Sequence, residues 1–272
     1  MTTLFDPANR HVRVIRIGAG ISGLLMAYKI QTRCENVALE IYEKNESVGG
    51  TWFENRYPGY VCDVPSHSYV YPWALNLEWP RLLSNSADIL QYLNDVADSL
   101  DLRPYIRLNH RVAGCWWDEE KGKWKVKVQV VEPKKDRSSP EPAIVVSEFW
   151  DEGDVVLHAT GFLHRWSYPD IPGLEKFKGR LIHTAGWPDD YKEEEWIGQD
   201  VVVIGSGATS VQVIPLMQKH VKHMDVFVRS ANWFPLIAGH TGTDRQYDEN
   251  ECENFRNNPE ALIKHIKEIE FL

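Results

Sequence analysis

Short apolar runs, each ended by glycine or by a change in hydrophobic periodicity, divide this chain into predicted strands and helices. Residues 12–17 and 37–42 are rich in β-branched and aliphatic side chains, which is typical of strands in a parallel sheet. The segment between them repeats apolar residues at helical spacing. Its expected buried side carries Leu24, Leu25, Ala27, Tyr28 and Ile30. This order predicts a βαβ unit with parallel strands.

The middle of the chain follows a different pattern. Residues 86–100 predict an amphipathic helix with Ser86 as its cap, because their apolar residues fall on one face. We expect a strand over residues 106–112. Residues 124–130 alternate strictly, as a half-exposed antiparallel strand should, and residues 143–149 are its expected partner.

Beyond residue 150 the apolar runs return. Residues 154–161 are expected to form a short buried strand, and residues 201–204 and 225–228 predict the strands of a second βαβ unit. Pro259 opens a last amphipathic helix. Its apolar positions are Leu262, Ile263, Ile266 and Ile269.

A glycine pattern follows the first predicted strand. In Gly18-x-Gly20-x-x-Gly23, the first glycine allows a tight turn, the second lets backbone approach a pyrophosphate, and the third lets the helix pack on the sheet. Helix N–H groups would then meet the phosphates. Glu43 ends the second strand, where a ribose-binding acid is expected. A glycine-rich turn without ligand is the alternative, but the strand, helix and acid together favour dinucleotide binding.

A second glycine pattern follows residues 201–204. Gly205 and Gly207 repeat the first two glycines of the pattern after the first strand, and the small Ser210 takes the place of the third glycine. The next strand ends in Arg229 instead of an acid. A guanidinium there suits a 2′-phosphate, so the preferred nucleotide is NADPH; an exposed arginine at a strand end is the alternative.

Composition excludes several classes of function. The chain has 272 residues, enough for one large or two ordinary domains, and a net charge of -9 that argues against nucleic-acid binding. Its four cysteines are widely spaced, so neither a zinc site nor a disulfide framework is indicated, and no metal is expected. We see no signal sequence and no run long enough to span a membrane, and therefore expect a soluble, cytoplasmic protein.

The residues after Glu43 carry a family resemblance. The run from Gly49 to Tyr69, GGTWFENRYPGYVCDVPSHSY, resembles the flavin-contacting segment of flavin-dependent Baeyer-Villiger monooxygenases, particularly fungal ones. Phe177 to Trp187 matches the family fingerprint FxGxxxHxxxW. The resemblance implies an α/β fold of two Rossmann-like domains. These are an FAD-binding domain over residues 1–165, with a small antiparallel β insertion, and a partial NADPH-binding domain over residues 166–272.

The resemblance also implies which residues form the sites. The expected cofactor-binding set is Gly18, Gly20, Gly23, Glu43, Gly50, Thr51, Trp52, Tyr57, Asp63, Val112, Gly205, Gly207, Ser210 and Arg229. Asp63 matches an aspartate that pairs with a catalytic arginine, which belongs to the part of the family's length that this chain does not match. Arg56 is the first candidate to replace that arginine. His183 belongs to the fingerprint and would couple domain movement to the cofactor; the alternative is that His183 and Trp187 only pack the interdomain linker.

The implied activity is insertion of one oxygen atom from O2 into a ketone or aldehyde, in the secondary metabolism of a polyketide or terpenoid. Two other functions stay open: a non-redox isomerase, cyclase or binding scaffold with the same fold, and a flavin monooxygenase that hydroxylates nitrogen or sulfur. Because the resemblance covers the N-terminal half of the family, we expect uncovered apolar edges around residues 201–204 and 226–228. Poor stability, a homo-oligomer or a second chain completing the fold would follow, together with low turnover.

Overall fold

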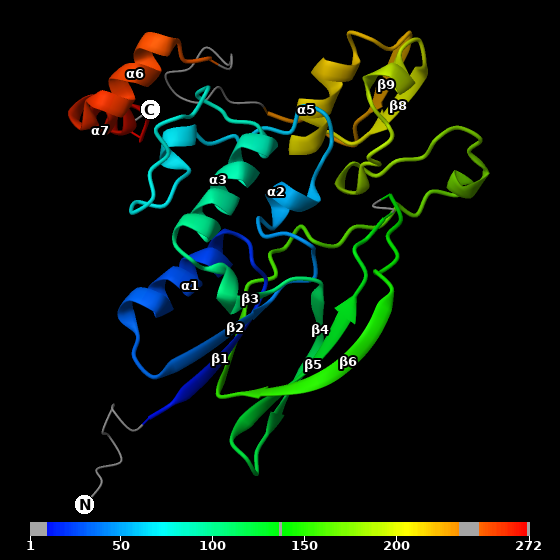
Figure 1. Cartoon of the computed structure of the whole chain (residues 1–272). Coiled ribbons are helices and arrows are strands. Elements are labelled where there is room, and N and C mark those ends of the chain that lie inside the picture. The colour runs from blue at the N-terminus through cyan, green and yellow to red at the C-terminus, as the bar shows by residue number, and fades with distance from the viewer. Residues whose placement is uncertain (1–9, 136–137, 234–244, 271–272) are drawn as a thin grey trace, which may run out of the picture. The chain divides into compact units, whose positions relative to one another are not determined.

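The computed structural model describes residues 10–135, 138–233 and 245–270, and its chain forms two compact units (Figure 1). The first unit contains Met1–Glu54 and Leu90–Gly186, and the second contains Asn55–Ile89 and Trp187–Leu272. The chain therefore passes from one unit to the other three times. This division does not test the predicted boundary at residue 165 between an FAD-binding and an NADPH-binding domain, which stays a prediction.

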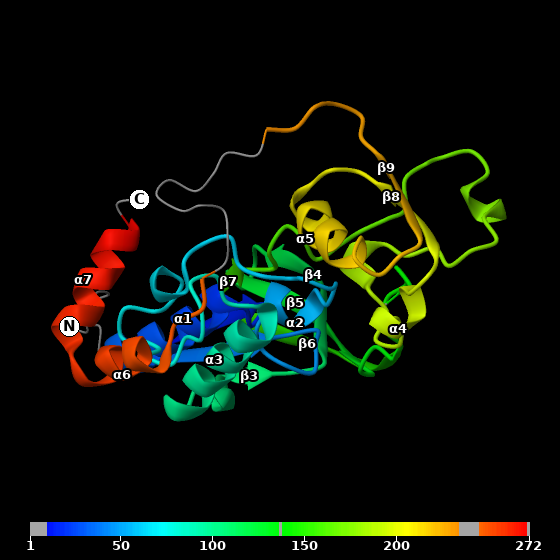
Figure 2. The same ribbon diagram turned by 90° about the horizontal axis from the view of Figure 1, so that it is seen from above.

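A parallel sheet forms the centre of the first unit. Its strands lie in the order β3-β2-β1-β7. Their bounds are β1 Val12–Ile17, β2 Val37–Tyr42, β3 Ile106–Arg107 and β7 Val155–His158. Helix α1 (Ile21–Arg33) joins β1 to β2, and Figures 1 and 2 show it alongside these strands. Its buried residues are Gly23, Leu24, Ala27 and Ile30. The predicted βαβ unit is confirmed.

An antiparallel sheet forms the predicted insertion. It runs in the order β4-β5-β6, with bounds His110–Asp118, Lys123–Val131 and Val145–Gly153. The fully buried Val126 and Val128 of β5 pack against Ile15 and Tyr42 of the parallel sheet, so the two sheets share one core. The alternation over residues 124–130 thus predicted the strand correctly. The expected partner over residues 143–149 is β6, which extends to Gly153. Strand β4 also pairs with β5, on its other side, and this pairing was not predicted.

Three local predictions are wrong, two of them in this unit. The expected strand over residues 106–112 is two strands in different sheets, separated by a turn at Asn109, whose φ is 59°. The chain leaves the parallel sheet here because His110 N–H donates to the Glu43 carbonyl at 2.8 Å. Strand β7 is an edge strand of the described sheet and is only half-buried, not buried.

The third error concerns the start of α3 (Ser86–Ser99). Asn85, not Ser86, caps this helix, since its Oδ1 accepts a hydrogen bond from the Asp88 N–H at 2.9 Å. Both residue types are good caps, and the longer amide side chain reaches the third helical N–H. The remaining helices of this unit are α2 Thr51–Glu54, η3 Arg103–Tyr105, η4 Leu174–Lys176 and η5 Thr184–Gly186.

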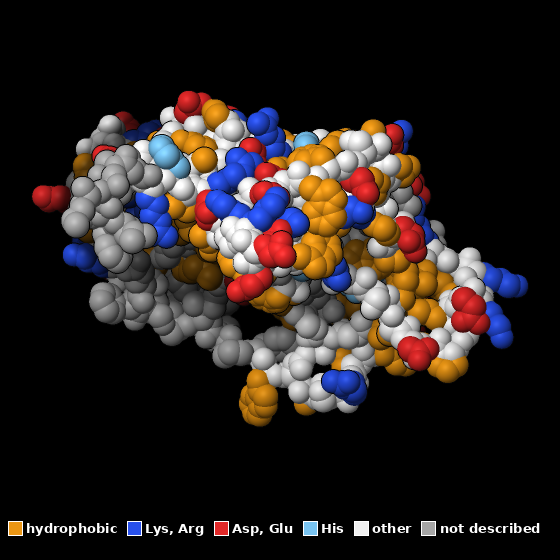
Figure 3. Space-filling model, turned by 90° about the horizontal axis from the view of Figure 1, so that it is seen from below, with side chains coloured by type: hydrophobic (Ala, Val, Ile, Leu, Met, Phe, Trp, Pro, Cys, Tyr) orange, Lys and Arg blue, Asp and Glu red, His pale blue; other side chains and the backbone are white. Residues whose placement is uncertain are grey.

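The second unit repeats the strand-helix-strand pattern. Strands β8 (Asp200–Ile204) and β9 (His223–Phe227) pair in parallel around α5 (Ala208–Met217). The predicted uncovered apolar positions are confirmed for the described residues, with Val202 52% and Phe227 62% exposed. Figure 3 shows one face of the molecule, where apolar side chains lie among acidic and basic ones.

Other helices complete the second unit. They are η2 Ser66–Ser68, α4 Glu193–Trp196, α6 Glu249–Asn257 and α7 Pro259–Glu270. Helix α7 begins at Pro259 as predicted, and Asn258 caps it, because Asn258 Oδ1 accepts from the Ala261 N–H at 3.2 Å. Of its predicted apolar positions, Leu262 and Ile269 are buried, whereas Ile263 is exposed. None of the helices in the described parts of the chain combines the length and apolar content of a membrane span.

A ring cluster joins η2 to α6 and α7. His67 is 2% exposed, and its ring centroid lies 5.4 Å from that of Tyr247 and 5.1 Å from those of Phe255 and His265. Neither ring nitrogen of His67 has a hydrogen-bond partner among the described residues. Burial, followed by the neighbouring His265, lowers the pKa of His67 to about 4. The cluster is therefore built for a neutral imidazole.

The first prediction concerns the packing of α1. A Cβ on Gly23 would lie 2.4 Å from the Gly18 carbonyl oxygen, which is fixed backbone. Gly23→Ala should therefore lower the free energy of unfolding by about 1 to 3 kcal/mol, the usual cost of overpacking. Urea denaturation followed by circular dichroism measures this. Gly207→Ala is the control, because its Cβ would meet no atom within 4 Å; equal stability of the two variants would contradict the packing role.

The second prediction concerns pH. Because the folded-state pKa of His67 is lowered, the unfolded chain binds more protons between pH 6.5 and about 4. The free energy of unfolding should fall as pH drops through this window, by about 3 kcal/mol for this residue. His67→Phe should reduce that fall by a similar amount in denaturant titrations at several pH values. His265 also titrates with a lowered pKa, so part of the slope should persist in the variant. An identical pH profile for both proteins would show that His67 is not buried as described.

Candidate functional site

The first glycine loop is held by backbone contacts that exclude side chains. Gly18 has a φ of 102°, and a Cβ there would lie 2.6 Å from the Ala159 carbonyl oxygen. Gly20 is the N-cap of α1 and offers no side-chain cap, and the first turn of the helix carries no acid. The loop therefore places neither a capping side chain nor an acid of the first turn at the helix N-terminus, which favours binding of an anion there.

The glycine pair that follows β2 lies against this loop. Gly49 N–H donates to the Ala19 carbonyl at 3.1 Å, and a Cβ on Gly50 would lie 3.1 Å from the Gly20 Cα. Thr51 and Trp52 begin α2 directly after this pair; Thr51 is half-buried and Trp52 is buried. The structure thus brings Gly18, Gly20, Gly23 and Gly50 together, with Thr51 next to Gly50 in the chain. That these residues bind a cofactor stays a prediction.

Glu43 holds the same loop through its carboxylate. Glu43 is only 4% exposed. Its carboxylate accepts hydrogen bonds from the N–H groups of Ala19 at 2.8 Å and Asn45 at 2.9 Å. Burial raises the pKa of Glu43, and the two backbone donors oppose this shift. Carboxylate oxygens have further acceptor sites, so Glu43 can also accept a hydrogen bond from a hydroxyl group. Its role in fixing the loop was not visible in the sequence.

Val112 lies elsewhere in the first unit. It pairs with Val128 and packs against the buried cluster of Ile15, Tyr42, Val126 and Val128. Its side chain therefore belongs to the core between the two sheets. Its assignment to the cofactor site stays a prediction.

The second glycine loop is open where the first is packed. Gly205 has a φ of 110°, and a Cβ on Gly205 or Gly207 would meet no atom within 4 Å. Gly207 is the N-cap of α5, again without a side-chain cap and without an acid in the first turn. The half-buried Ser210 lies in that first turn. Space is therefore available beside backbone that could bind a phosphate.

The run from Arg229 to Trp233 is attached to this loop. Asn232 Nδ2 donates to the Ser206 carbonyl at 2.6 Å, which ties the run after β9 to the residue between the two glycines. Arg229 is exposed. The structure therefore places an accessible guanidinium on a segment that is fastened to the second loop. Sequence reasoning missed the role of Asn232, although its place in the Arg-x-x-Asn-Trp run was a signal.

Tyr57 is hydrogen-bonded to α5 within the second unit, and its assignment to the cofactor site stays a prediction. It is buried, and its hydroxyl donates to Gln212 Oε1 of α5 at 3.1 Å. Burial raises the pKa of Tyr57; the Thr209 side chain opposes this shift and the Asp63 charge adds to it. Gln212 was missed in the sequence, where the signal was a single amide inside the apolar run Val211 to Leu216.

Asp63 and Arg56, the two candidate catalytic residues near Tyr57 in the sequence, make different contacts. Asp63 is exposed, and its charge acts on the Tyr57 hydroxyl. Arg56 Nη1 lies 3.0 Å from Asp189 Oδ1 in an ion pair near the surface. The described contacts therefore join Arg56 to Asp189, and the suggested replacement of a catalytic arginine by Arg56 stays a prediction.

The fingerprint residues pack as aromatic pairs. His183 stacks on Trp166 with 4.7 Å between ring centroids, and its Nδ1 accepts from the Ala185 N–H at 3.1 Å. Burial lowers the pKa of His183. Trp187 is buried and donates from Nε1 to the Tyr191 carbonyl at 2.8 Å. These contacts support a structural role for both residues. The chain passes from the first unit to the second between them.

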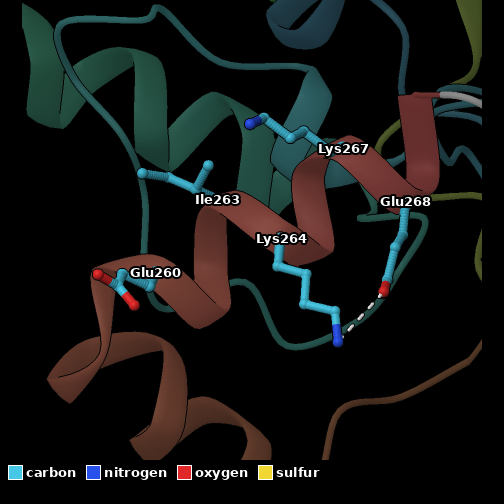
Figure 4. Close-up of a pocket in the computed structure, with 5 residues that line it drawn as sticks. All are labelled: Glu260, Ile263, Lys264, Lys267 and Glu268. Atoms are coloured by element: carbon cyan, nitrogen blue, oxygen red, sulfur yellow. Dashed lines mark ion pairs between the residues drawn. The ribbon is translucent and has the colours of Figure 1, made fainter.

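A surface hollow on α7 lies apart from the two glycine loops in the sequence. Figure 4 shows its lining, Glu260, Ile263, Lys264, Lys267 and Glu268, all from one helix. Lys264 and Glu268 form an ion pair at 3.8 Å. A hollow formed by one exposed helix lacks the converging groups of a ligand pocket. Among the residues that the structure describes, no group of three or more His, Cys, Asp or Glu could hold a metal ion.

These features define a class of protein: an α/β fold in which two glycine loops each lead from a parallel strand into an uncapped helix. The model of the NAD(P)-binding Rossmann-like domain matches residues 17–83. An FAD-binding monooxygenase of Dothistroma septosporum is 52% identical over 266 residues, which are 97% of this chain and 41% of the relative. An FAD-binding monooxygenase of Emericella nidulans is 48% identical over 271 residues, 99% of this chain and 44% of the relative.

Solved structures agree with these relatives. The complex of OTEMO with FAD and NADP superposes with a TM-score of 0.75 and 29% identity over 94% of this chain and 45% of that chain. A Baeyer-Villiger monooxygenase of Streptomyces coelicolor is 38% identical over 229 residues, 84% of this chain and 40% of the relative. The chain is a homologue of the FAD-binding and Baeyer-Villiger monooxygenases. It spans less than half the length of these relatives, and the predicted resemblance is confirmed.

Proposed function

We propose that the protein is an FAD- and NADPH-dependent monooxygenase of the Baeyer-Villiger type. Two glycine loops with uncapped helix N-termini, in a homologue of such enzymes, carry the proposal. The reaction would convert a ketone, O2, NADPH and a proton into an ester, NADP+ and water. An aldehyde would react in the same sense.

FAD fits the first loop. Gly18, Gly20 and Gly50 form a cradle of backbone that a side chain would fill, and α1 directs its N-terminus to it. Glu43 would accept a hydrogen bond from a ribose hydroxyl, in addition to those from its two backbone donors. Thr51 and Trp52 would lie along the cofactor. Bound flavin supplies the redox chemistry with O2, while these residues bind and orient it.

NADPH fits the second loop. Gly205, Gly207 and Ser210 would receive the pyrophosphate at the N-terminus of α5, where open space adjoins the backbone. Arg229 would bind the 2′-phosphate, because the guanidinium is accessible and always charged. Asp63 would act electrostatically near the reacting groups, with Tyr57 and Arg56 as neighbours in the sequence. His183 would couple domain movement to the cofactor through the linker and would not transfer a proton.

The substrate class rests on the relatives. The fungal homologues favour a carbonyl compound of secondary metabolism, such as a polyketide or terpenoid. A non-redox scaffold is the second candidate function, favoured by the exposed apolar face of β8 and β9. Absorption of the purified protein in the flavin bands, followed by NADPH oxidation and mass spectrometry of the product, decides between them. A colourless protein that FAD does not reconstitute would refute the monooxygenase proposal.

The third prediction tests the first loop. Gly20→Val should reduce FAD affinity at least ten-fold, or about 1.4 kcal/mol, since branched methyl groups would enter the space between Gly20 and Gly50. Fluorescence titration of the apoprotein with FAD measures the affinity. Gly207→Val is the matched control in the second loop and should leave FAD affinity unchanged. Unaltered FAD binding by a folded Gly20→Val variant would remove the cofactor from this loop.

The fourth prediction tests nucleotide choice. Arg229→Ala should weaken NADPH by about 10- to 150-fold, because loss of a charge-assisted phosphate contact costs about 1.5 to 3 kcal/mol. NADH affinity should change little. Calorimetric titration with both nucleotides measures the difference, and Lys222→Ala, which removes another exposed cation of the same unit, is the control. Equal weakening of NADH and NADPH would separate Arg229 from the 2′-phosphate.

A further inference from the structure

One amide side chain of α5 holds the segment that carries Tyr57 and Asp63. Gln212 Oε1 accepts from the Tyr57 hydroxyl at 3.1 Å, and its Nε2 donates to the Val61 carbonyl at 3.0 Å. Both ends of the amide are therefore used on the same short segment. An amide that satisfies a donor and an acceptor at once fixes both position and orientation.

The backbone of Gln212 makes the same segment fit closely. Gly59 has a φ of 77°, and a Cβ there would lie 2.8 Å from the Gln212 carbonyl oxygen. The turn between Tyr57 and Val61 is therefore pressed against α5, and only glycine is accommodated at its closest point. The Tyr57 ring also packs at a tilt against the Tyr60 ring, with 4.7 Å between ring centroids.

The position of Gln212 on α5 links this contact to the second glycine loop. Helical side chains project toward the N-terminus of their helix, so Gln212 covers the first turn, which begins after Gly207. Thr209 of that turn also acts on the Tyr57 hydroxyl, because it opposes the rise in the pKa of Tyr57. The first turn of α5 and the 57–63 segment are thus joined through Gln212 and Tyr57.

We propose that Gln212 is a positioning residue that couples nucleotide binding at the second loop to the 57–63 segment. A phosphate bound at the first turn of α5 would restrain Thr209 and Gln212, and through them Tyr57, the Val61 carbonyl and the adjoining Asp63. This inference rests on the proposed NADPH site. It assigns the coupling to a residue that contacts neither reacting group.

Hydrogen-deuterium exchange on the full chain tests the coupling without turnover. Addition of saturating NADP+ should slow exchange at least about five-fold in peptides covering residues 205–211 and 57–63 of the unaltered protein. Gln212→Leu should keep the protection of residues 205–211 and lose that of residues 57–63. Gln218→Leu is the matched control, because Gln218 is exposed at the other end of α5, and it should behave as the unaltered protein.

Two further variants separate the hydrogen bonds and cover the case in which Gln212→Leu does not fold. Gln212→Glu keeps the acceptor for Tyr57 and loses the donor to Val61, whereas Tyr57→Phe loses only the hydroxyl bonds. Each should reduce the protection of residues 57–63, and the affinity for NADP+ should stay within about two-fold.

The outcomes distinguish the two proposals. Protection of residues 205–211 alone in the unaltered protein, or equal protection of residues 57–63 in all variants, would overturn the coupling while leaving the NADPH site intact. Lack of protection in both segments would overturn the NADPH site, and the coupling with it. In the FAD-loaded protein, Gln212→Leu should slow flavin reduction about ten-fold with little change in the NADPH dissociation constant.

Discussion

Close approach of backbone to backbone is the constraint on which the first unit depends. Gly18 lies against the Ala159 carbonyl, Gly23 against the Gly18 carbonyl, and Gly50 against Gly20. Each contact needs a missing side chain, so the turn after β1, the helix α1 and the turn after β2 can only assemble as one layer. The buried Glu43 carboxylate then fixes the loop by accepting the Ala19 N–H. Packing and ligand binding have the same cause here, because the absent side chains also leave the helix N-terminus open to an anion.

The second unit uses the same glycine pattern under different constraints. Neither Gly205 nor Gly207 is pressed by another atom within 4 Å where a Cβ would be, so these glycines are not required by packing. The loop is instead held by a polar contact from Asn232 to the Ser206 carbonyl, and Gln212 of the following helix holds the segment that carries Tyr57. A packed loop resists movement, whereas a loop held by a few hydrogen bonds can respond to what binds it.

Local patterns predicted most elements because their cause is local. Both strand-helix units, the alternation of β5 and the acid after β2 follow from side-chain periodicity and the conformational freedom of glycine. The errors arise where a distant partner decides the structure. The turn at Asn109 depends on a hydrogen bond from His110 to Glu43, which no period-two pattern contains. Similarly, Gln212 is recognisable as a polar residue in an apolar helix, but its partners Tyr57 and Val61 are far from it in the sequence.

The run that resembles a flavin-contacting segment is divided by the structure. Gly49 and Gly50 pack on the first glycine loop, while Tyr57 and Val61 are bound to α5, and the boundary between the units falls between Glu54 and Asn55. A resemblance assigns such a run as a whole, because sequence similarity does not say which contacts each residue makes. The contacts show that the start of the run is held by the first glycine loop, whereas Tyr57 and Val61 are held by α5.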